Sequence, residues 1–107
     1  MPQFKLEFNK IFRDQLREIK GYLLKHRDRT ETVERFLRHV ASRIAQLKDF
    51  PQLGKVCEYN PKFRRILVDE YVIFYRAMMR EKVIRIEFIF HGTQNLPIIL
   101  RESGEVG

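Results

Sequence analysis

The side chains best suited to chemistry in this chain are a histidine and several arginines in its second half. His91 closes an apolar run, and an imidazole side chain can give or take a proton near neutral pH. A histidine at the end of a strand also often does no more than hydrogen-bond to a nearby carbonyl group. Cationic side chains in the same region can hold phosphates or carboxylates, and they are Arg64, Arg65, Arg80 and Arg85. The sequence therefore permits either acid–base catalysis or the binding of an anionic partner.

The sequence gives little indication of a disulfide bond or of a metal site. Cys57 is the only cysteine, so we expect no disulfide framework and no thiolate metal site. No residue pattern indicates a cofactor. A single cysteine also suits a reducing compartment.

Charge and hydropathy limit the classes of function. The chain has 107 residues, which suits one domain spanning 1–107, and 21 Lys and Arg outnumber 14 Asp and Glu to give a net charge of +7. A positive excess of this size favours an anionic partner, either nucleic acid or an acidic protein surface. The sequence contains no run of about 18 apolar residues and no signal-peptide pattern, so we expect a soluble cytoplasmic protein without membrane contact.

Two helices are expected after a short N-terminal strand. Apolar and charged residues alternate over Phe4–Phe8, which predicts a strand, and the period then changes to that of a helix over Lys10–His26. A second apolar stripe predicts another helix that ends before Pro51, and either Asp28 or Thr30 can cap its start. The stripes comprise Phe12, Leu16, Ile19 and Leu23 in the first helix and Val33, Leu37, Val40, Ile44 and Leu47 in the second.

Three further strands follow a loop. Residues 52–62 contain turn-forming residues and are predicted to be a loop, whereas the ranges 64–70, 71–79 and 83–91 are rich in Ile, Val, Phe and Tyr. We predict an α+β fold in which an N-terminal strand and an antiparallel two-helix hairpin precede a three-strand antiparallel meander and a short C-terminal segment. The helices are expected to cover one apolar face of the sheet.

The register of the last two strands decides which side chains share a face. A two-residue turn at Glu81 and Lys82 would pair Met79 with Ile84, Ala77 with Ile86, Tyr75 with Phe88 and Ile73 with Phe90 on the helix-facing side. The same register places Arg76 opposite Glu87 as a surface ion pair and His91 beside Val72 on the second face. That face would also carry Phe74, Met78 and Ile89, an apolar patch that either the segment 96–100 or a partner should cover.

An ordered set of residues gives the chain a family resemblance. The set begins with Phe36, Ile44 and Leu47 leading to Phe50, Pro51 and Gly54, continues with strand residues 65–68 and 71–76, and ends with the strand 83–90 followed by His91, Gly92, Thr93 and Gln94. In this order the chain resembles the RelE/ParE superfamily, the toxins of bacterial type II toxin-antitoxin pairs. The resemblance covers nearly the whole chain and implies a cognate antitoxin that joins the toxin in a hetero-oligomer.

One activity that the resemblance implies is cleavage of messenger RNA on the ribosome. RelE-like members use cationic strand residues, and Arg65 matches one of them, but Val72 and Gln94 stand where such members carry arginine. Other RNA-cleaving members use a histidine near the end of the last strand with a glutamate from the preceding loop, which would be His91 with Glu58. An endoribonuclease built on this chain would therefore use Glu58, Arg65 and His91.

The other implied activity, which the sequence favours, is inhibition of DNA gyrase by binding, as in ParE-like members. The ending His91-Gly92-Thr93-Gln94 looks more like the ParE-type ending, and inhibition by binding requires no catalytic set. The residues expected to contact the antitoxin or the target are Arg64, Arg65, Val72, Phe74, Arg76, Met78, Arg85, Ile89, His91 and Gln94. A third hypothesis is a family member that has lost its toxicity and only binds a partner.

Overall fold

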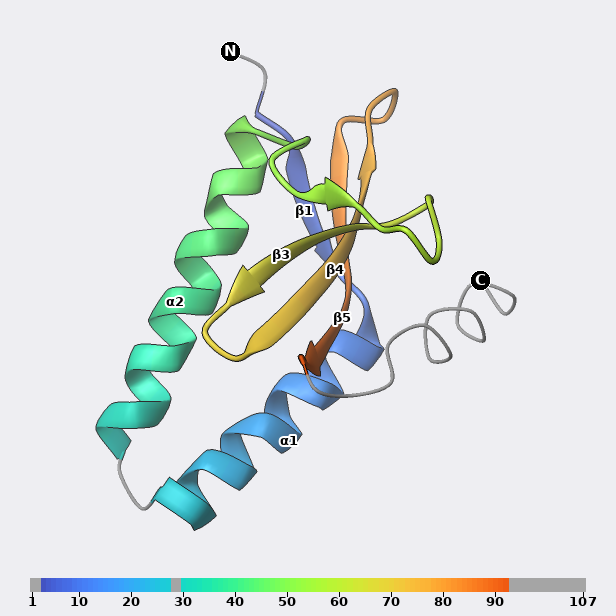
Figure 1. Cartoon of the computed structure of the whole chain (residues 1–107). Coiled ribbons are helices and arrows are strands. Elements are labelled where there is room, and N and C mark those ends of the chain that lie inside the picture. Colours follow the sequence, from blue (N-terminus) through green and yellow to red (C-terminus); the bar gives the residue numbers. More distant parts are fainter. Residues whose placement is uncertain (1–2, 28–29, 93–107) are drawn as a thin grey trace.

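A five-stranded mixed sheet carries two helices on one of its faces (Figure 1). The computed structural model describes residues 3–27 and 30–92. Along the chain the elements are β1 (Lys5–Phe8), α1 (Lys10–Arg27), α2 (Thr30–Asp49), β2 (Lys55–Val56), β3 (Arg64–Val68), β4 (Tyr71–Met78) and β5 (Val83–His91). The strand order is β1-β5-β4-β3-β2, with β1 parallel to β5 and the other neighbours antiparallel. The predicted α+β architecture is confirmed.

Local signals in the sequence match the start of α1 and both ends of α2. Asn9 caps α1, because its side-chain Oδ1 accepts a hydrogen bond of 2.9 Å from the backbone N–H of Ile11. α2 carries Glu31 in its first turn and Lys48 in its last, charges whose signs the helix dipole favours at those ends. α2 begins at Thr30. Asp28, the other residue that the sequence offered as a cap for this helix, lies outside the described residues. Gln94 and the segment 96–107, which the sequence analysis also discussed, lie outside them as well.

The main hydrophobic core lies between the helices and the sheet. Its most buried members, each with 0% exposure, are Leu47 of α2, Ile73 and Tyr75 of β4, and Ile84 and Ile86 of β5. These side chains hold the centre of the sheet to α2. No helix in the described part of the chain is both long enough and apolar enough to cross a lipid bilayer.

A smaller hydrophobic cluster lies on the opposite side of the sheet, which we call the second face. Cys57 and Phe63 pack there against Val72, Phe74 and Phe88, and Phe90 packs on the edge of the cluster. The prediction that residues 52–62 form a loop was wrong at Lys55–Val56, which form β2 and pair with Arg65 and Arg64 of β3. Directly after β2, the backbone N–H of Cys57 donates a hydrogen bond of 2.8 Å to the carbonyl of Phe63. The β2–β3 pairing and this hydrogen bond together hold the loop between the two strands against the sheet.

The predicted register of β4 and β5 was wrong in two respects. The turn spans residues 79–82 rather than two residues, with Lys82 at φ 57°, so Ala77 pairs with Ile84 and Tyr75 with Ile86. A β-bulge then leaves Glu87 without a partner on β4, because the next pair is Phe74 with Phe88.

The bulge exchanges the faces of every residue that follows it on β5. Phe88 and Phe90 therefore lie on the second face, whereas Ile89 joins the helix-facing core. His91 pairs with Tyr71 instead of Val72, so the prediction that His91 lies on the second face was also wrong.

Candidate functional site: a cationic sheet face and a histidine pocket

Glu87 holds two arginines together on the second face. Arg76 of β4 is directly opposite Arg85 of β5, and the bulge brings the Glu87 carboxylate within ion-pair distance of both. Oε2 of Glu87 lies 2.8 Å from Nε of Arg76, and Oε1 lies 3.2 Å from Nε of Arg85. The N–H at Arg76 Nε does not satisfy hydrogen-bond geometry, so its contact with Glu87 is an ion pair.

Burial makes this ion pair different from the surface pair that the sequence predicted. The Glu87 side chain is only 7% exposed, whereas Arg76 and Arg85 are 31% and 41% exposed. Asn9 also donates its Nδ2–H to Oε1 of Glu87 at 2.9 Å, which links the cap of α1 to the bulge. Two guanidinium groups share one carboxylate, so the cluster keeps a net positive charge that an anionic partner can reach from solvent.

Arg65 adds a third cation to the second face. It is opposite Phe74 on β4, and its Nη2 lies 3.6 Å from Oε1 of Glu58 in the loop after β2. Arg64 has a different environment, because its Nη1 donates to the carbonyl of Gly54 at 2.7 Å and thereby holds the loop after α2. Of the arginines expected to bind a partner, Arg65, Arg76 and Arg85 thus share the second face, while Arg64 has a structural contact.

The apolar residues expected to bind a partner are mostly buried. Val72, Phe74 and Ile89 are 5%, 1% and 1% exposed, so their side chains cannot form a contact surface in this conformation. Met78 is partly buried at the end of β4, opposite Val83. The candidate surface on the second face is therefore mainly the cationic group of Arg65, Arg76 and Arg85.

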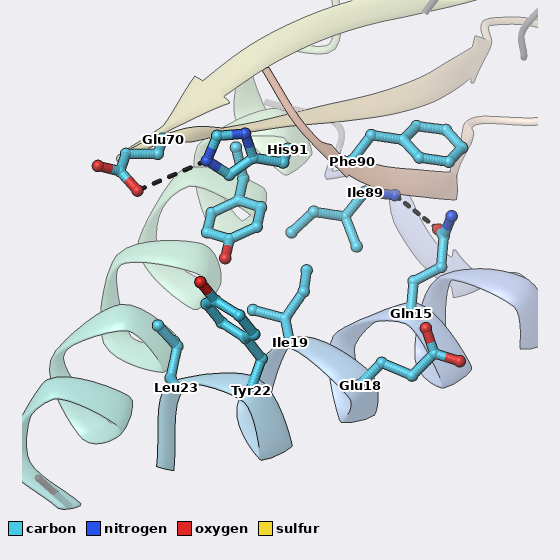
Figure 2. A pocket seen from close by; sticks show the side chains of 10 residues that line it. Gln15, Glu18, Ile19, Tyr22, Leu23, Glu70, Ile89, Phe90 and His91 are labelled. Atoms are coloured by element: carbon cyan, nitrogen blue, oxygen red, sulfur yellow. Dashed lines mark hydrogen bonds and ion pairs between the residues drawn. The ribbon is translucent and has the colours of Figure 1, made fainter. Parts of the chain in front are cut away.

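His91 lies in a pocket between α1 and the C-terminal end of β5 (Figure 2). The pocket has a volume of about 520 Å³ and is lined by Gln15, Glu18, Ile19, Tyr22, Leu23, Glu70, Tyr71, Ile89, Phe90 and His91. Nε2 of His91 is 3.6 Å from Oε2 of Glu70, and its ring meets that of Tyr71 edge-on with centroids 5.3 Å apart. At the other wall, Gln15 accepts a hydrogen bond of 2.8 Å from the backbone N–H of Ile89.

The lining of this pocket does not suit phosphoryl chemistry. Its ionisable members include the carboxylates Glu18 and Glu70, and none of the lining residues within the described ranges 3–27 and 30–92 is a lysine or an arginine. A phosphorane would meet repulsion from the two carboxylates, and the described part of the lining would offer it no lysine or arginine to stabilise its charge. The described residues also include no group of three or more His, Cys, Asp and Glu side chains that could hold a metal ion.

The sheet keeps His91 apart from the other two nuclease candidates. Arg65 and Phe74 form a pair on the second face, whereas His91 and Tyr71 form a pair on the helix-facing side. Strand spacing places the Cα atoms of Arg65 and His91 roughly 14 Å apart, from roughly 10 Å along β5 and roughly 10 Å across two strand intervals. Glu58 remains with Arg65, so the predicted set of Glu58, Arg65 and His91 is not brought together.

Sequence reasoning missed the buried hydroxyl that positions the loop after α2. Tyr75 is 0% exposed, donates its O–H to the carbonyl of Pro51 at 2.9 Å and accepts the N–H of Gly54 at 2.8 Å. A Cβ at Gly54 would lie only 2.7 Å from the Tyr75 ring and from the carbonyl oxygen of Arg65, so the close approach requires glycine. Burial raises the pKa of Tyr75 above its ordinary value of 10.0, an effect that the hydrogen bond from Gly54 partly offsets.

Solved structures with the same fold are toxins and toxin-antitoxin complexes. The isolated RelE toxin of E. coli aligns with a TM-score of 0.60 at 10% identity, covering 97% of this chain and 99% of that chain. The intact E. coli RelBE toxin-antitoxin complex aligns with a TM-score of 0.60 at 12% identity, covering 85% and 99%. The chromosomal ParDE toxin-antitoxin system from P. aeruginosa aligns with a TM-score of 0.58 at 18% identity, covering 85% and 98%. At these identities the likeness establishes the fold alone.

The family itself follows from the sequence match rather than from the structural likeness. Among curated proteins, no sequence matches the chain significantly. A family model for the ParE toxin of the type II toxin-antitoxin system parDE, however, matches residues 6–96. This match includes β1 except for Lys5, both helices and all the sheet residues that form the cationic face and the histidine pocket. The chain therefore belongs to the ParE toxin family of type II toxin-antitoxin systems.

Proposed function

We propose that this toxin inhibits DNA gyrase by binding to it, without catalysis, and that a cognate antitoxin neutralises it. The observation that carries the proposal is the placement of His91 and the Arg65–Glu58 pair on opposite faces of the sheet. Metal-free cleavage of RNA needs a proton acceptor and a cation at the same phosphate. A toxin that acts by binding needs no such set, and membership of the ParE family supports the same choice.

The second face is the surface that we assign to the target. Arg65, Arg76 and Arg85 are each partly exposed, and Glu58 and Glu87 hold their guanidinium groups in place. Arginines fixed in this way bind carboxylates or phosphates with less loss of side-chain entropy than mobile ones. Together with the net charge of +7, this favours an acidic target surface.

The proposal also includes the setting of the protein. We infer one toxin domain over residues 1–107, a cytoplasmic location, and a hetero-oligomer with the antitoxin. No cofactor or metal takes part in the proposed mode of action.

A supercoiling assay with purified gyrase tests the proposal directly. We expect equimolar toxin to inhibit supercoiling or to trap the cleaved enzyme–DNA complex, and we expect the substitutions Arg65→Ala and Arg76→Ala to weaken this effect. Arg17→Ala is the matched control, because Arg17 is exposed on α1 and its nearest ionic partner is Asp14 at 3.9 Å. Full supercoiling at stoichiometric wild-type toxin would overturn the proposal.

The alternative is a ribosome-dependent endoribonuclease that uses Glu58, Arg65 and His91. It requires a rearrangement that brings His91 and Arg65 to one phosphate on the ribosome. Mapping of cuts in translated messages decides this point, since the nuclease hypothesis expects wild-type cuts that His91→Gln abolishes. Absence of cuts, or an unchanged pattern in His91→Gln, excludes the proposed role of His91.

A further inference from the structure

Asn9 joins three elements of the fold at one point. It lies between the end of β1 and the start of α1, beside the bulge of β5. Its backbone N–H donates to the carbonyl of Ile86 at 2.9 Å, and its side-chain Oδ1 accepts the N–H of Ile11 at the same distance. Its Nδ2–H donates to Oε1 of Glu87, also at 2.9 Å. The side chain is therefore held to the helix by its oxygen and to the bulge by its nitrogen.

The two side-chain contacts of Asn9 use the two ends of an amide. The N–H of Ile11 needs an acceptor and the carboxylate of Glu87 needs a donor, so Oδ1 must face the helix and Nδ2 the bulge. Ionised aspartate has acceptors but no donor, and serine has a single oxygen atom, which cannot lie at both positions that the amide oxygen and nitrogen occupy. Aspartate and serine cap helices as well as asparagine does. Capping alone would therefore accept any of the three residues, whereas the contact with Glu87 requires the amide.

The contact with Asn9 helps to determine where the Glu87 carboxylate lies. Oε1 of Glu87, the atom that Asn9 holds, is 3.2 Å from Nε of Arg85. Oε2 of the same carboxylate is 2.8 Å from Nε of Arg76. Both arginines are thus anchored through Nε, and the remaining N–H donors of each guanidinium group lie on its Nη atoms, where a partner can bind. A shift of this one carboxylate would release both arginines at once.

We propose that Asn9 is a positioning residue of the target surface, because its amide fixes Glu87 and thereby holds Arg76 and Arg85 as a pair that binds one anionic group. The two arginines are directly opposite each other on β4 and β5, which suits two guanidinium groups that contact the same phosphate or carboxylate. The inference rests on the proposed function, since it concerns the surface assigned to gyrase. It adds to that surface a residue that acts through Glu87 rather than by touching the target.

NMR spectroscopy of the arginine side chains tests the positioning without gyrase. The probe is pyrophosphate, which is titrated while the Nε–H signals of Arg76 and Arg85 are followed, so that binding is measured at this pair. We expect Asn9→Asp to weaken pyrophosphate binding at least about tenfold, because a second carboxylate beside Glu87 repels it and offsets part of the positive charge. Asn9→Ser should weaken binding about threefold, because it keeps the cap but loses the donor. In the free protein, both variants should exchange these two N–H groups with water at least about threefold faster.

Controls separate positioning from net charge and from unfolding. Asn60→Asp makes the same change of charge in the loop between β2 and β3, where Oδ1 of Asn60 accepts the N–H of Lys62, and it should bind pyrophosphate as the wild type does. The Nε–H signal of Arg65, whose ionic partner is Glu58, should stay unchanged in both Asn9 variants. Native amide signals throughout α2 show that a variant folds. Should Asn9→Asp unfold, Asn9→Ser decides the question, because it adds no charge.

The outcomes separate this inference from the proposed function. Wild-type pyrophosphate affinity in the Asn9 variants, or unchanged exchange at Arg76 and Arg85, overturns the inference whether or not the toxin inhibits gyrase. Failure of the wild-type toxin to inhibit gyrase overturns the proposed target, and the pyrophosphate result still decides the positioning by Asn9. Where the wild type does inhibit gyrase, Asn9→Asp should need at least about tenfold more protein for the same inhibition. Equal potency of that variant would overturn the role of Asn9 in the target surface.

Discussion

Replacing Tyr75 with phenylalanine should destabilise the fold far more than the loss of one surface hydroxyl. The Tyr75 hydroxyl is fully buried and joins two backbone groups of the loop after α2, the carbonyl of Pro51 at 2.9 Å and the N–H of Gly54 at 2.8 Å. Phenylalanine keeps the ring and its packing against the core. The substitution therefore isolates the contribution of the two hydrogen bonds.

The size of the effect follows from what remains after the hydroxyl is removed. The N–H of Gly54 is buried, so leaving it without an acceptor costs about 1–3 kcal/mol. The carbonyl of Pro51 is only partly buried and can hydrogen-bond to water, so its loss adds about 0.5–1 kcal/mol. We expect the free energy of unfolding to fall by about 1.5–4 kcal/mol, a large share of the roughly 5–15 kcal/mol that stabilises a typical domain.

Urea denaturation followed by circular dichroism measures this change. Tyr59→Phe is the matched control, because Tyr59 is 48% exposed, so its substitution should alter stability by less than about 0.5 kcal/mol. A loss below about 1 kcal/mol for Tyr75→Phe would refute the reasoning. It would mean that water or a shift of the loop replaces both hydrogen bonds at little cost.

Two further predictions concern charge. Burial raises the pKa of Tyr75, so the folded protein keeps the hydroxyl proton at a pH where the unfolded chain has lost it. The contribution of the protonated Tyr75 to the free energy of unfolding should therefore be complete below pH 10.0, the pKa in the unfolded chain, and should be lost as the pH rises through the higher pKa of the folded protein. Denaturation midpoints between pH 9 and about pH 11 should therefore fall less steeply in Tyr75→Phe than in the wild type, and parallel curves would contradict this. Glu87→Gln should lower the free energy of unfolding by about 2 kcal/mol, because Arg76 and Arg85 then face each other without a carboxylate. Urea denaturation at low and high salt checks it, since salt should reduce the loss; an unchanged midpoint at low salt would show that the carboxylate contributes little.

The helices and the order of the elements could be predicted because their signals are local. The apolar stripe of α1 indicated Lys10–His26, and the helix spans Lys10–Arg27. Alternation likewise identified β4 and β5, and it placed Ile73 and Tyr75 correctly against the helices. Each of these features depends on residues within a few positions of one another, which is the range over which periodicity carries information.

The face of each residue beyond Glu87 could not be predicted, because a bulge adds a residue without breaking the apolar pattern. Phe88, Ile89 and Phe90 are all apolar, so either register buries apolar side chains on both faces. The one local signal was Glu87 itself, a charge inside an apolar strand, which a bulge can turn toward Arg76 and Arg85. The separation of His91 from Arg65 follows directly from this single inserted residue.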